Sequence, residues 1–576
     1  MRATRTLLAR AAILAATAAG LALGGTGGAG AQGVAPLLAP AAGSYLAARA
    51  ADRANDFGAA SRWFLQALAE DPQNAELVDR CLAALIGLGD FETAEPLALR
   101  AVADGTGTQT ANIVLMAMAA TAGDWAQVTG NLDDGQTVSQ LIDGLARAWA
   151  AVALDDRTAA LAGFDALVAD PGTVQFGLYH KALALAVLGD LEGADALFSG
   201  APDNGLPYTR RSIVAHAQIL SQLGRPERAR TELARFGANV DPAILALREA
   251  LDRGETLPMT VVTSPTEGLA EGFHNVARLL IDTAPEAYVL LFARVAEHLN
   301  PDDAETLMLS GGLLEAVGRY DLAGAAYARV PETDPAFYSA EFSRAAVLRR
   351  SGAPEQAVEV LREMLARYPG LAMAHAELAD ALRALDRTAE AREAYGEAID
   401  LLPETDARLW RMRFLRGVMS EKLGDWPAAR DDLRAAYALH PDEPGLLNFL
   451  GYAMVERGED LDEALELIER AMAVEPDNGA IVDSYGWALY RLGRFDEAVA
   501  PMETAIRLDP ENAVINDHLG DVYWRVGRIL EAHFQWQRAL SFETDPALLD
   551  AIRAKLDGGL APEPVDAPDE TALQDN

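Results

Sequence analysis

Apolar residues recur along this chain at the spacing of helices that pack against one another. In one helix of each expected pair, a small residue is followed four positions later by a larger one, so both lie on the same helix face. Four such pairs in succession are Ala323 and Tyr327, Ala357 and Leu361, Ala391 and Tyr395, and Ala429 and Leu433. A Gly-x-aromatic segment precedes some of them, and glycine readily takes the left-handed conformation that ends a helix. The pattern predicts an all-α protein built from helix pairs.

The helix pairs recur with a period of 34 residues. Equivalent alanines keep this step in two series: Ala464, Ala498 and Ala532, and Ala471, Ala505 and Ala539. Prolines that would stop the second helix of a pair keep the same step at Pro301, Pro335, Pro369 and Pro403. One helix pair of this length cannot bury its apolar face alone, so successive pairs must stack. The period therefore predicts an α-solenoid.

The most regular repeats lie in residues 444–546. Their motifs are Asn448-Phe-Leu-Gly-Tyr452, Asp483-Ser-Tyr-Gly-Trp-Ala-Leu-Tyr490 and Asp517-His-Leu-Gly-Asp-Val-Tyr-Trp524. With these motifs and the period, the chain from about residue 41 to 546 resembles an array of about 13 to 15 tetratricopeptide (helix-turn-helix) repeats. The last repeats are similar to those of exported bacterial proteins, some of which are adaptors that present substrates to a carboxyl-terminal processing protease. This resemblance implies a binding protein with a protein partner.

Changes in the repeat pattern divide the chain. We expect an N-terminal array over residues 41–236, degenerate in 130–236, and a C-terminal array over 271–546. Residues 237–270 break the period and place β-branched residues between Pro258 and Pro265, which disfavours helix. An extended connector is therefore expected there. Residues 547–556 are expected to form a capping helix, and the acidic residues 557–576 a disordered tail.

The first 31 residues have the order of a secretory signal peptide. Arg2, Arg5 and Arg10 form a basic start, residues 11–23 are apolar, and residues 29–31 have the small-x-small form of a cleavage site. No cysteine stands at that site, so a lipoprotein is not expected. The sequence predicts export to the periplasm and no transmembrane segment after removal of the signal. An uncleaved membrane anchor and an organelle transit peptide are the alternatives.

The charge of the chain narrows the choice of partners. Asp and Glu number 86 against 48 Lys and Arg, which gives a formal net charge of −38. So acidic a surface repels nucleic acid and anionic lipid, and we expect neither as a partner. Cys81 is the single cysteine, which excludes an intramolecular disulfide and any metal site built from several cysteines.

The sequence contains no catalytic or cofactor motif. None of the eight histidines has the His-Glu-x-x-His or another metal spacing, and there is no Gly-x-Ser-x-Gly and no phosphate-binding loop sequence. We therefore expect a protein that is not an enzyme and uses no cofactor, metal or small-molecule substrate. An enzyme with a site assembled across repeats is the remote alternative. The adjacent Asp517 and His518 are expected either as a polar contact in a groove or as packed helix surface.

A repeat solenoid presents the first helices of its pairs on its concave side, where a partner segment can lie. The residues expected to line this groove stand on the first helices of the last repeats. They are Asn448, Tyr452, Asp483, Trp487, Tyr490, Asp517, Asp521 and Trp524. Exposed Trp and Tyr rimmed by acids suit a peptide or a basic patch of a protein. Packing of both Trp side chains between neighbouring repeats is the alternative.

These features predict a non-catalytic protein-interaction scaffold or adaptor of the bacterial cell envelope. Its expected partner is a protein or peptide, such as a periplasmic protease or an envelope assembly factor. The alternative function is a structural role in envelope or outer-membrane assembly without a ligand in the groove.

Overall fold

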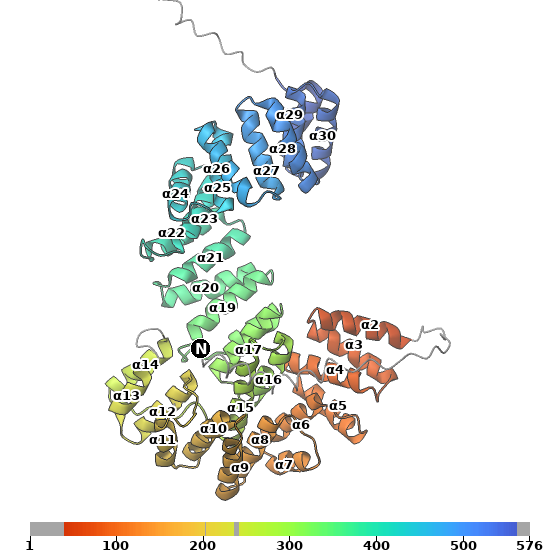
Figure 1. Ribbon diagram of the computed structural model, residues 1–576. Coiled ribbons are helices and arrows are strands. Elements are labelled where there is room, and N and C mark those ends of the chain that lie inside the picture. The colour runs from red at the N-terminus through yellow and green to blue at the C-terminus, as the bar shows by residue number, and fades with distance from the viewer. Residues whose placement is uncertain (1–39, 202, 236–240, 562–576) are drawn as a thin grey trace, which may run out of the picture. The chain divides into compact units, whose positions relative to one another are not determined.

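The computed structural model describes residues 40–201, 203–235 and 241–561, and all regular elements in these residues are helices (Figure 1). Helices α2–α13 form six consecutive pairs, and α15–α30 form eight. α14 lies between the two series, and α31 follows the second. The predicted all-α solenoid of helix pairs is confirmed. The predicted signal peptide lies outside the described residues, as do residues 562–576 of the predicted tail.

The chain divides into two compact units, residues 1–364 and 365–576, called here the N-terminal unit and the C-terminal unit. The first twelve helices of the N-terminal unit are α2 (Pro40–Arg53), α3 (Phe57–Glu70), α4 (Ala75–Leu88), α5 (Phe91–Ala103), α6 (Gln109–Thr121), α7 (Trp125–Asp133), α8 (Gln140–Ala153), α9 (Arg157–Ala169), α10 (Val174–Val187), α11 (Leu191–Ser199), α12 (Arg210–Gln222) and α13 (Pro226–Ala234). Its other helices are α14 (Pro242–Asp252), α15 (Pro265–Leu280), α16 (Glu286–Leu299), α17 (Ala304–Ala316), α18 (Tyr320–Tyr327), α19 (Phe337–Arg350) and most of α20 (Pro354–Arg367).

The C-terminal unit is itself a stack of helix pairs. Its helices are α21 (Ala372–Ala384), α22 (Thr388–Asp400), α23 (Leu409–Lys422), α24 (Trp426–Leu439), α25 (Pro444–Arg457), α26 (Leu461–Val474), α27 (Gly479–Arg491), α28 (Phe495–Leu508), α29 (Ala513–Arg525), α30 (Ile529–Phe542) and α31 (Pro546–Gly558). α31 lies where the capping helix is predicted, one residue earlier at its start and two residues longer at its end.

The prediction of an extended connector over residues 237–270 is wrong for two stretches. Residues 242–252 form α14, because the Asp241 side chain accepts hydrogen bonds from the backbone N–H groups of Ala243 (2.9 Å) and Ile244 (3.3 Å). Pro242 at the first helical position also suits a helix start. Residues 265–270 begin α15, which Ser264 caps. The compact units divide at residue 364 rather than in this segment.

A Gly-Asp-aromatic turn joins the two helices of several pairs, and each residue has a local role. Gly89 ends α4 with a left-handed φ of 80°, which strains any residue with a Cβ. The side chain of Asp90 then accepts a hydrogen bond from the backbone N–H of Thr93 at 3.0 Å. Phe91 follows as the first, buried residue of α5. The same turn recurs at residues 123–125 and 424–426.

The first helices of the C-terminal pairs line the inner, concave side of the stack. α25 contacts α27, and α27 contacts α29, as well as their own second helices. The second helices α26 and α28 have no comparable contact with each other among the described residues. Elements on the inside of a curve lie closer together than those on the outside. The predicted groove residues therefore stand on inner helices.

The inner side of the N-terminal unit is filled by its own chain. α15 packs against α8 and α10, and α16 packs against α4 and α6 (Figure 1). Gly268 of α15 lies so close to the Trp149 ring that an added Cβ would stand 2.3 Å from it. The guanidinium of Arg294 in α16 donates a hydrogen bond to the backbone carbonyl of Leu88 at 2.7 Å. Both contacts join segments more than a hundred residues apart.

Candidate protein-binding groove

The predicted groove residues of the C-terminal unit come from three inner helices. α25 carries Asn448 and Tyr452; α27 carries Asp483, Trp487 and Tyr490; and α29 carries Asp517, Asp521 and Trp524. The side chains of α27 and α29 are bound to one another, to Glu456 of α25 and to Lys555 of α31. Among the predicted groove residues, two keep a buried acceptor oxygen without a hydrogen-bond partner in the described part of the chain, Asn448 (Oδ1) on α25 and Asp517 (Oδ1) on α29.

Trp487 is held by its own chain. Its indole stacks on Tyr490, with ring centroids 4.6 Å apart, and on His518, with centroids 3.9 Å apart and the planes 8° from parallel. Its Nε1–H donates a hydrogen bond to Glu456 at 2.6 Å. An aromatic ring with these contacts is a fixed part of the inner face rather than a free anchor.

His518 pairs with Asp483 of the preceding repeat. Its Nδ1 lies 3.0 Å from the Asp483 carboxylate, and both side chains are buried. Burial disfavours the charged imidazolium, but Asp483, Asp517 and Asp521 outweigh it and raise the pKa of His518. The neighbour in sequence, Asp517, makes its own contact elsewhere. The spacing of Asp483 and His518 is 35 residues, one more than the repeat period, so comparison of equivalent positions does not find this pair.

Lys555 of α31 forms ion pairs with two acidic residues of the inner face. Sequence analysis did not predict a role for this lysine. Its Nζ lies 2.7 Å from Asp517 and 2.8 Å from Asp521. Asp521 also accepts a hydrogen bond from the Trp536 indole at 2.9 Å, and burial raises its pKa. The sequence held two signals for it: lysine is rare, with only three in the chain, and Lys555 stands one repeat period of 34 residues after Asp521.

Trp524 packs within the end of the stack. Its ring centroid lies 5.4 Å from that of Trp536. A Cβ added at Gly559, just after α31, would stand 2.0 Å from the Trp524 ring, so the chain passes directly over the indole. Trp487 and Trp524 are thus both in contact with neighbouring repeats or with the segment that follows them.

The inner face of α25 carries one buried acceptor without a partner. The Oδ1 atom of Asn448 makes no hydrogen bond among the described residues, and neither does Oδ1 of Asp517 on α29. An unsatisfied buried acceptor costs about 1–3 kcal/mol. Burial raises the pKa of the half-buried Tyr452, as do the nearby Glu456 and Asp483. One repeat earlier, the exposed Lys422 occupies the place of Glu456, 34 residues before it.

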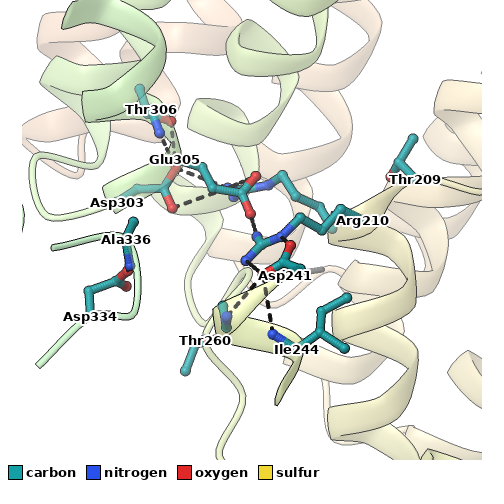
Figure 2. Close-up of polar contacts among 12 residues, drawn as sticks. Thr209, Arg210, Asp241, Ile244, Thr260, Asp303, Glu305, Thr306, Asp334 and Ala336 are labelled. Atoms are coloured by element: carbon teal, nitrogen blue, oxygen red, sulfur yellow. Dashed lines mark hydrogen bonds and ion pairs between the residues drawn. The ribbon is translucent and has the colours of Figure 1, made fainter. Parts of the chain in front are cut away.

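A separate charged cluster in the N-terminal unit joins helices and offers no open site. Figure 2 shows Arg210, at the start of α12, between Asp241 and Glu305. Its neighbour Arg211 is buried and pairs with Glu271 of α15 at 2.6 Å and with Asp303 at 3.1 Å. Asp241 and Asp303 also cap α14 and α17. The arginines therefore tie α12 to three other helices.

The residues that the structure describes hold no group of three or more His, Cys, Asp or Glu side chains placed to bind a metal ion. No helix among them has the length and apolar character needed to cross a membrane.

Sequence comparison gives the family of these repeats. Residues 313–372, 342–406, 376–444 and 450–513 match the model of the tetratricopeptide repeat. The protein contains tetratricopeptide repeats. The last match holds Tyr452, Asp483, Trp487 and Tyr490 of the inner face. The finer resemblance to protease adaptors remains a prediction.

Individual relatives also carry these repeats. A tetratricopeptide repeat-containing protein of Pseudomonas aeruginosa is 30% identical over 170 residues, which are 29% of this chain and 28% of the relative. The chain is also similar to a tetratricopeptide repeat protein from Parabacteroides merdae (15% identity, TM-score 0.36, 44% of this chain and 97% of that chain). The Cut9–Hcn1 hetero-tetramer of the APC/C is matched at 14% identity and a TM-score of 0.36, over 91% of this chain and 97% of that chain.

Proposed function

We propose that this protein is a non-catalytic scaffold of the bacterial cell envelope that binds a partner protein or peptide on the inner face of its C-terminal unit. The repeat fold supports protein binding in general, because stacked helix pairs present an extended preformed surface. The basic, apolar and small-residue order of residues 1–31 supports export.

The difference between the inner faces of the two units carries the proposal. In the N-terminal unit α15 and α16 lie on the inner helices, so a partner would have to displace them. In the C-terminal unit the main helix contacts among the described residues are between neighbours in the stack. The inner face of the C-terminal unit is therefore the one left for a partner.

Within that face, the surface from α23 to α25 is the best-supported binding region. Asn448 and Tyr452 stand on α25, which also carries Phe449; the Phe449 ring packs edge to face with Phe414 of α23, with ring centroids 5.9 Å apart. A peptide backbone offers an acceptor for the Tyr452 hydroxyl, and a donor for Asn448 Oδ1 if that buried side chain turns outward. The exposed Lys422 adds a cation at one edge.

Site-specific crosslinking tests this assignment. A photoreactive amino acid is placed at Lys422 on the inner face and, as the matched control, at the exposed Glu466 on the outer helix α26. Cells that express each form are irradiated, and the adducts are identified by mass spectrometry. We expect one protein adduct from position 422 that Asn448→Ala/Tyr452→Phe reduces at least fivefold. Equal labelling from both positions, unaffected by the double substitution, would refute binding on the inner face.

The structure also supports the alternative of a structural assembly factor without a groove ligand. Trp487 and Trp524 are engaged by their own chain, so the strongest expected anchors are not free. Adducts confined to the outer position 466 would favour this function.

The location in the envelope is tested separately. Fractionation of cells, followed by sequencing of the mature N-terminus, should find the protein in the periplasm and beginning at Gln32. Recovery in the cytoplasm with Met1 or Arg2 at the N-terminus would refute export, whatever the result for the groove.

A further inference from the structure

A line of cations marks one end of the inner helices in the C-terminal unit. The last residues of α23, α25, α27 and α29, called here the cationic rim, are Lys422, Arg457, Arg491 and Arg525. A cation at the end of a helix favours the helix dipole, and this effect is the same for inner and outer helices. Of the outer helices α22, α24, α26, α28 and α30, however, only α28 has a basic residue in its last turn. The rim is therefore a property of the inner side.

The rim is continuous from α23 to α29. Each of its arginines contacts the inner helix before its own: Arg457 with Glu421 (2.9 Å), Arg491 with Glu456 (3.7 Å) and Arg525 with the Tyr490 hydroxyl (3.4 Å). Lys422 and Arg525 have no carboxylate partner among the described residues. Both ends of the rim thus carry a cation that its own chain does not neutralise there.

The chain that follows α31 reaches the rim at Arg525. Leu560 is half-buried against the apolar core of the C-terminal unit. The backbone carbonyl of the next residue, Ala561, accepts a hydrogen bond from Arg525 at 2.9 Å. Residues 562–576 are joined to Ala561, so they start at this end of the rim.

Residues 562–576, called here the acidic segment, have the charge and the length to follow the rim. They contain no Lys, Arg or His, and their acids are Glu563, Asp566, Asp569, Glu570 and Asp575. An extended chain of this length spans roughly 50 Å. Three steps between neighbouring inner helices, about 10 Å each, separate α29 from α23. The segment is therefore long enough to reach Lys422.

The charge of the whole chain directs the acidic segment to the rim. A formal net charge of −38 repels the segment from most of the surface, and the rim is an exception to that repulsion. An exposed ion pair contributes little by itself. A segment tethered at one end of the rim, however, has an effective concentration on the order of millimolar there, so several weak ion pairs are enough to hold it.

We propose that the acidic segment, residues 562–576, docks along the cationic rim of its own chain. Its carboxylates then lie against Arg525, Arg491 and Lys422, and it covers the ends of the inner helices from α29 to α23. A partner that binds at these helix ends has to displace it. Only this last consequence rests on the proposed function, and the tests below measure the docking itself.

Intramolecular photocrosslinking tests the docking. The Ala567→Cys protein is labelled with benzophenone maleimide, and the native Cys81 does not compete because it is fully buried. After irradiation, adducts in the monomer band are mapped by mass spectrometry. We expect roughly fivefold more adducts on the inner helices α25 and α27 than on the outer helices α26 and α28 of the same repeats. Equal labelling of inner and outer helices would overturn the proposal.

Reversal of the rim charge tests the cause of that preference. Lys422→Glu/Arg491→Glu removes two rim cations and leaves the acidic segment unchanged. The matched control, Arg430→Glu/Arg507→Glu, makes the same change of charge at exposed arginines of the outer helices α24 and α28. The rim variant should label inner and outer helices equally, and the control should keep the inner preference. A preference that survives in the rim variant, or is lost equally in the control, would overturn the proposal.

Neutralisation of the segment provides a test that leaves every repeat intact. Asp566→Asn/Asp569→Asn/Glu570→Gln, made in the Ala567→Cys protein, should label inner and outer helices equally. The unsubstituted segment should lose its preference between 0.1 and 1 M NaCl, where the screening length falls from about 10 Å to about 3 Å. An inner preference that persists in the neutral segment or at 1 M salt would show that the rim cations do not hold it, and would overturn the proposal.

Discussion

The imidazole of His518 lies parallel to the indole of Trp487, with ring centroids 3.9 Å apart, while its Nδ1 lies 3.0 Å from the carboxylate of Asp483. One ring thus connects α29 with two residues of α27. The charged imidazolium is attracted both by the carboxylate and by the face of the indole. The contact between these two repeats consequently depends on the protonation state of His518.

We predict that the C-terminal unit loses stability as pH rises above neutrality, through His518. Its pKa is raised in the folded chain, so its stabilising contribution is fully present below the unfolded value of about 6.5 and is lost as pH rises through the higher folded value. Hydrogen exchange of α27 and α29 peptides between pH 6 and 9, corrected for the intrinsic exchange rate, measures the effect. His518→Gln should abolish the pH dependence and cost about 3 kcal/mol, because it leaves the charge of Asp483 buried. An unchanged pH dependence in this variant would contradict the assignment.

The N-terminal unit should respond to acid in the opposite sense. The Trp149 indole donates a hydrogen bond to His180 Nδ1 at 3.1 Å, which requires that nitrogen to be unprotonated. Burial lowers the pKa of His180 to about 4, and that of His274 to about 4 with help from Arg211. Between pH 6.5 and 4 the unfolded chain therefore binds more protons than the folded one. The free energy of unfolding should fall by roughly 1 kcal/mol per pH unit for each histidine.

Urea denaturation from pH 7 to 5, followed by hydrogen exchange in α8 and α10, measures this loss. His180→Gln keeps an acceptor for Trp149 but does not titrate, so its stability should fall less steeply with acid. The half-buried His375, which lies in the C-terminal unit, provides the control, and His375→Gln should behave as the wild type in α8 and α10. A parallel loss in all three proteins would show that His180 does not cause it.

The regular features of this fold could be predicted because they are local. The 34-residue spacing, the Gly-Asp-aromatic turns and the small residues at helix crossings all act within one repeat. Gly486 is an example, since an added Cβ would stand 2.4 Å from Met502 of its own helix pair. The identity of the inner helices also follows from the repeat alone.

The packing of α15 and α16 on the inner helices of the N-terminal unit could not be predicted from the repeat period. It depends on contacts such as that of Arg294 with the Leu88 carbonyl, 206 residues apart. No period in the sequence marks such a pair. α14 was missed because its start signal is two residues, Asp241 and Pro242, next to a segment that lacks the repeat.

The sequence predicted which helices carry the candidate groove residues. It did not predict the hydrogen-bond and ion-pair partners of their side chains. All eight expected residues stand on inner helices, yet the partners of Asp483 and Asp517 come from the next element along the stack, 35 and 38 residues later. Side chains of consecutive first helices meet across the inner face, so they satisfy one another before any partner arrives. Comparing equivalent positions of adjacent repeats would have suggested Lys555, which stands 34 residues after Asp521. It would not have found His518, because the residue equivalent to Asp483 is Asp517.

The buried ion pair of Arg211 should be far more sensitive to substitution than an exposed one. Arg211→Met leaves Glu271 and Asp303 without their cation, and we expect a loss of about 3–5 kcal/mol in the free energy of unfolding of the N-terminal unit. Replacing Glu271 by Met as well should restore part of that loss. Arg147→Met breaks the exposed pair with Asp133 (2.6 Å) and should cost less than about 1 kcal/mol. Equal costs for Arg211→Met and Arg147→Met in urea denaturation would contradict a buried network.

The packing of α15 on the N-terminal inner face should depend on the absence of a side chain at Gly268. Because an added Cβ would stand 2.3 Å from the buried Trp149 ring, Gly268→Leu must push α15 away from α8. We expect the N-terminal unit to lose about 3 kcal/mol or more, and hydrogen exchange to rise in α8, α10 and α15. Gly312→Leu is the matched control, since Gly312 also lies within a helix but has no atom within 4 Å of an added Cβ. Exchange in the C-terminal unit should stay unchanged in both variants, because the Gly268 contact lies wholly within the N-terminal unit. If Gly268→Leu exchanges no faster than Gly312→Leu in α8 and α10, then α15 does not hold the inner face closed in solution.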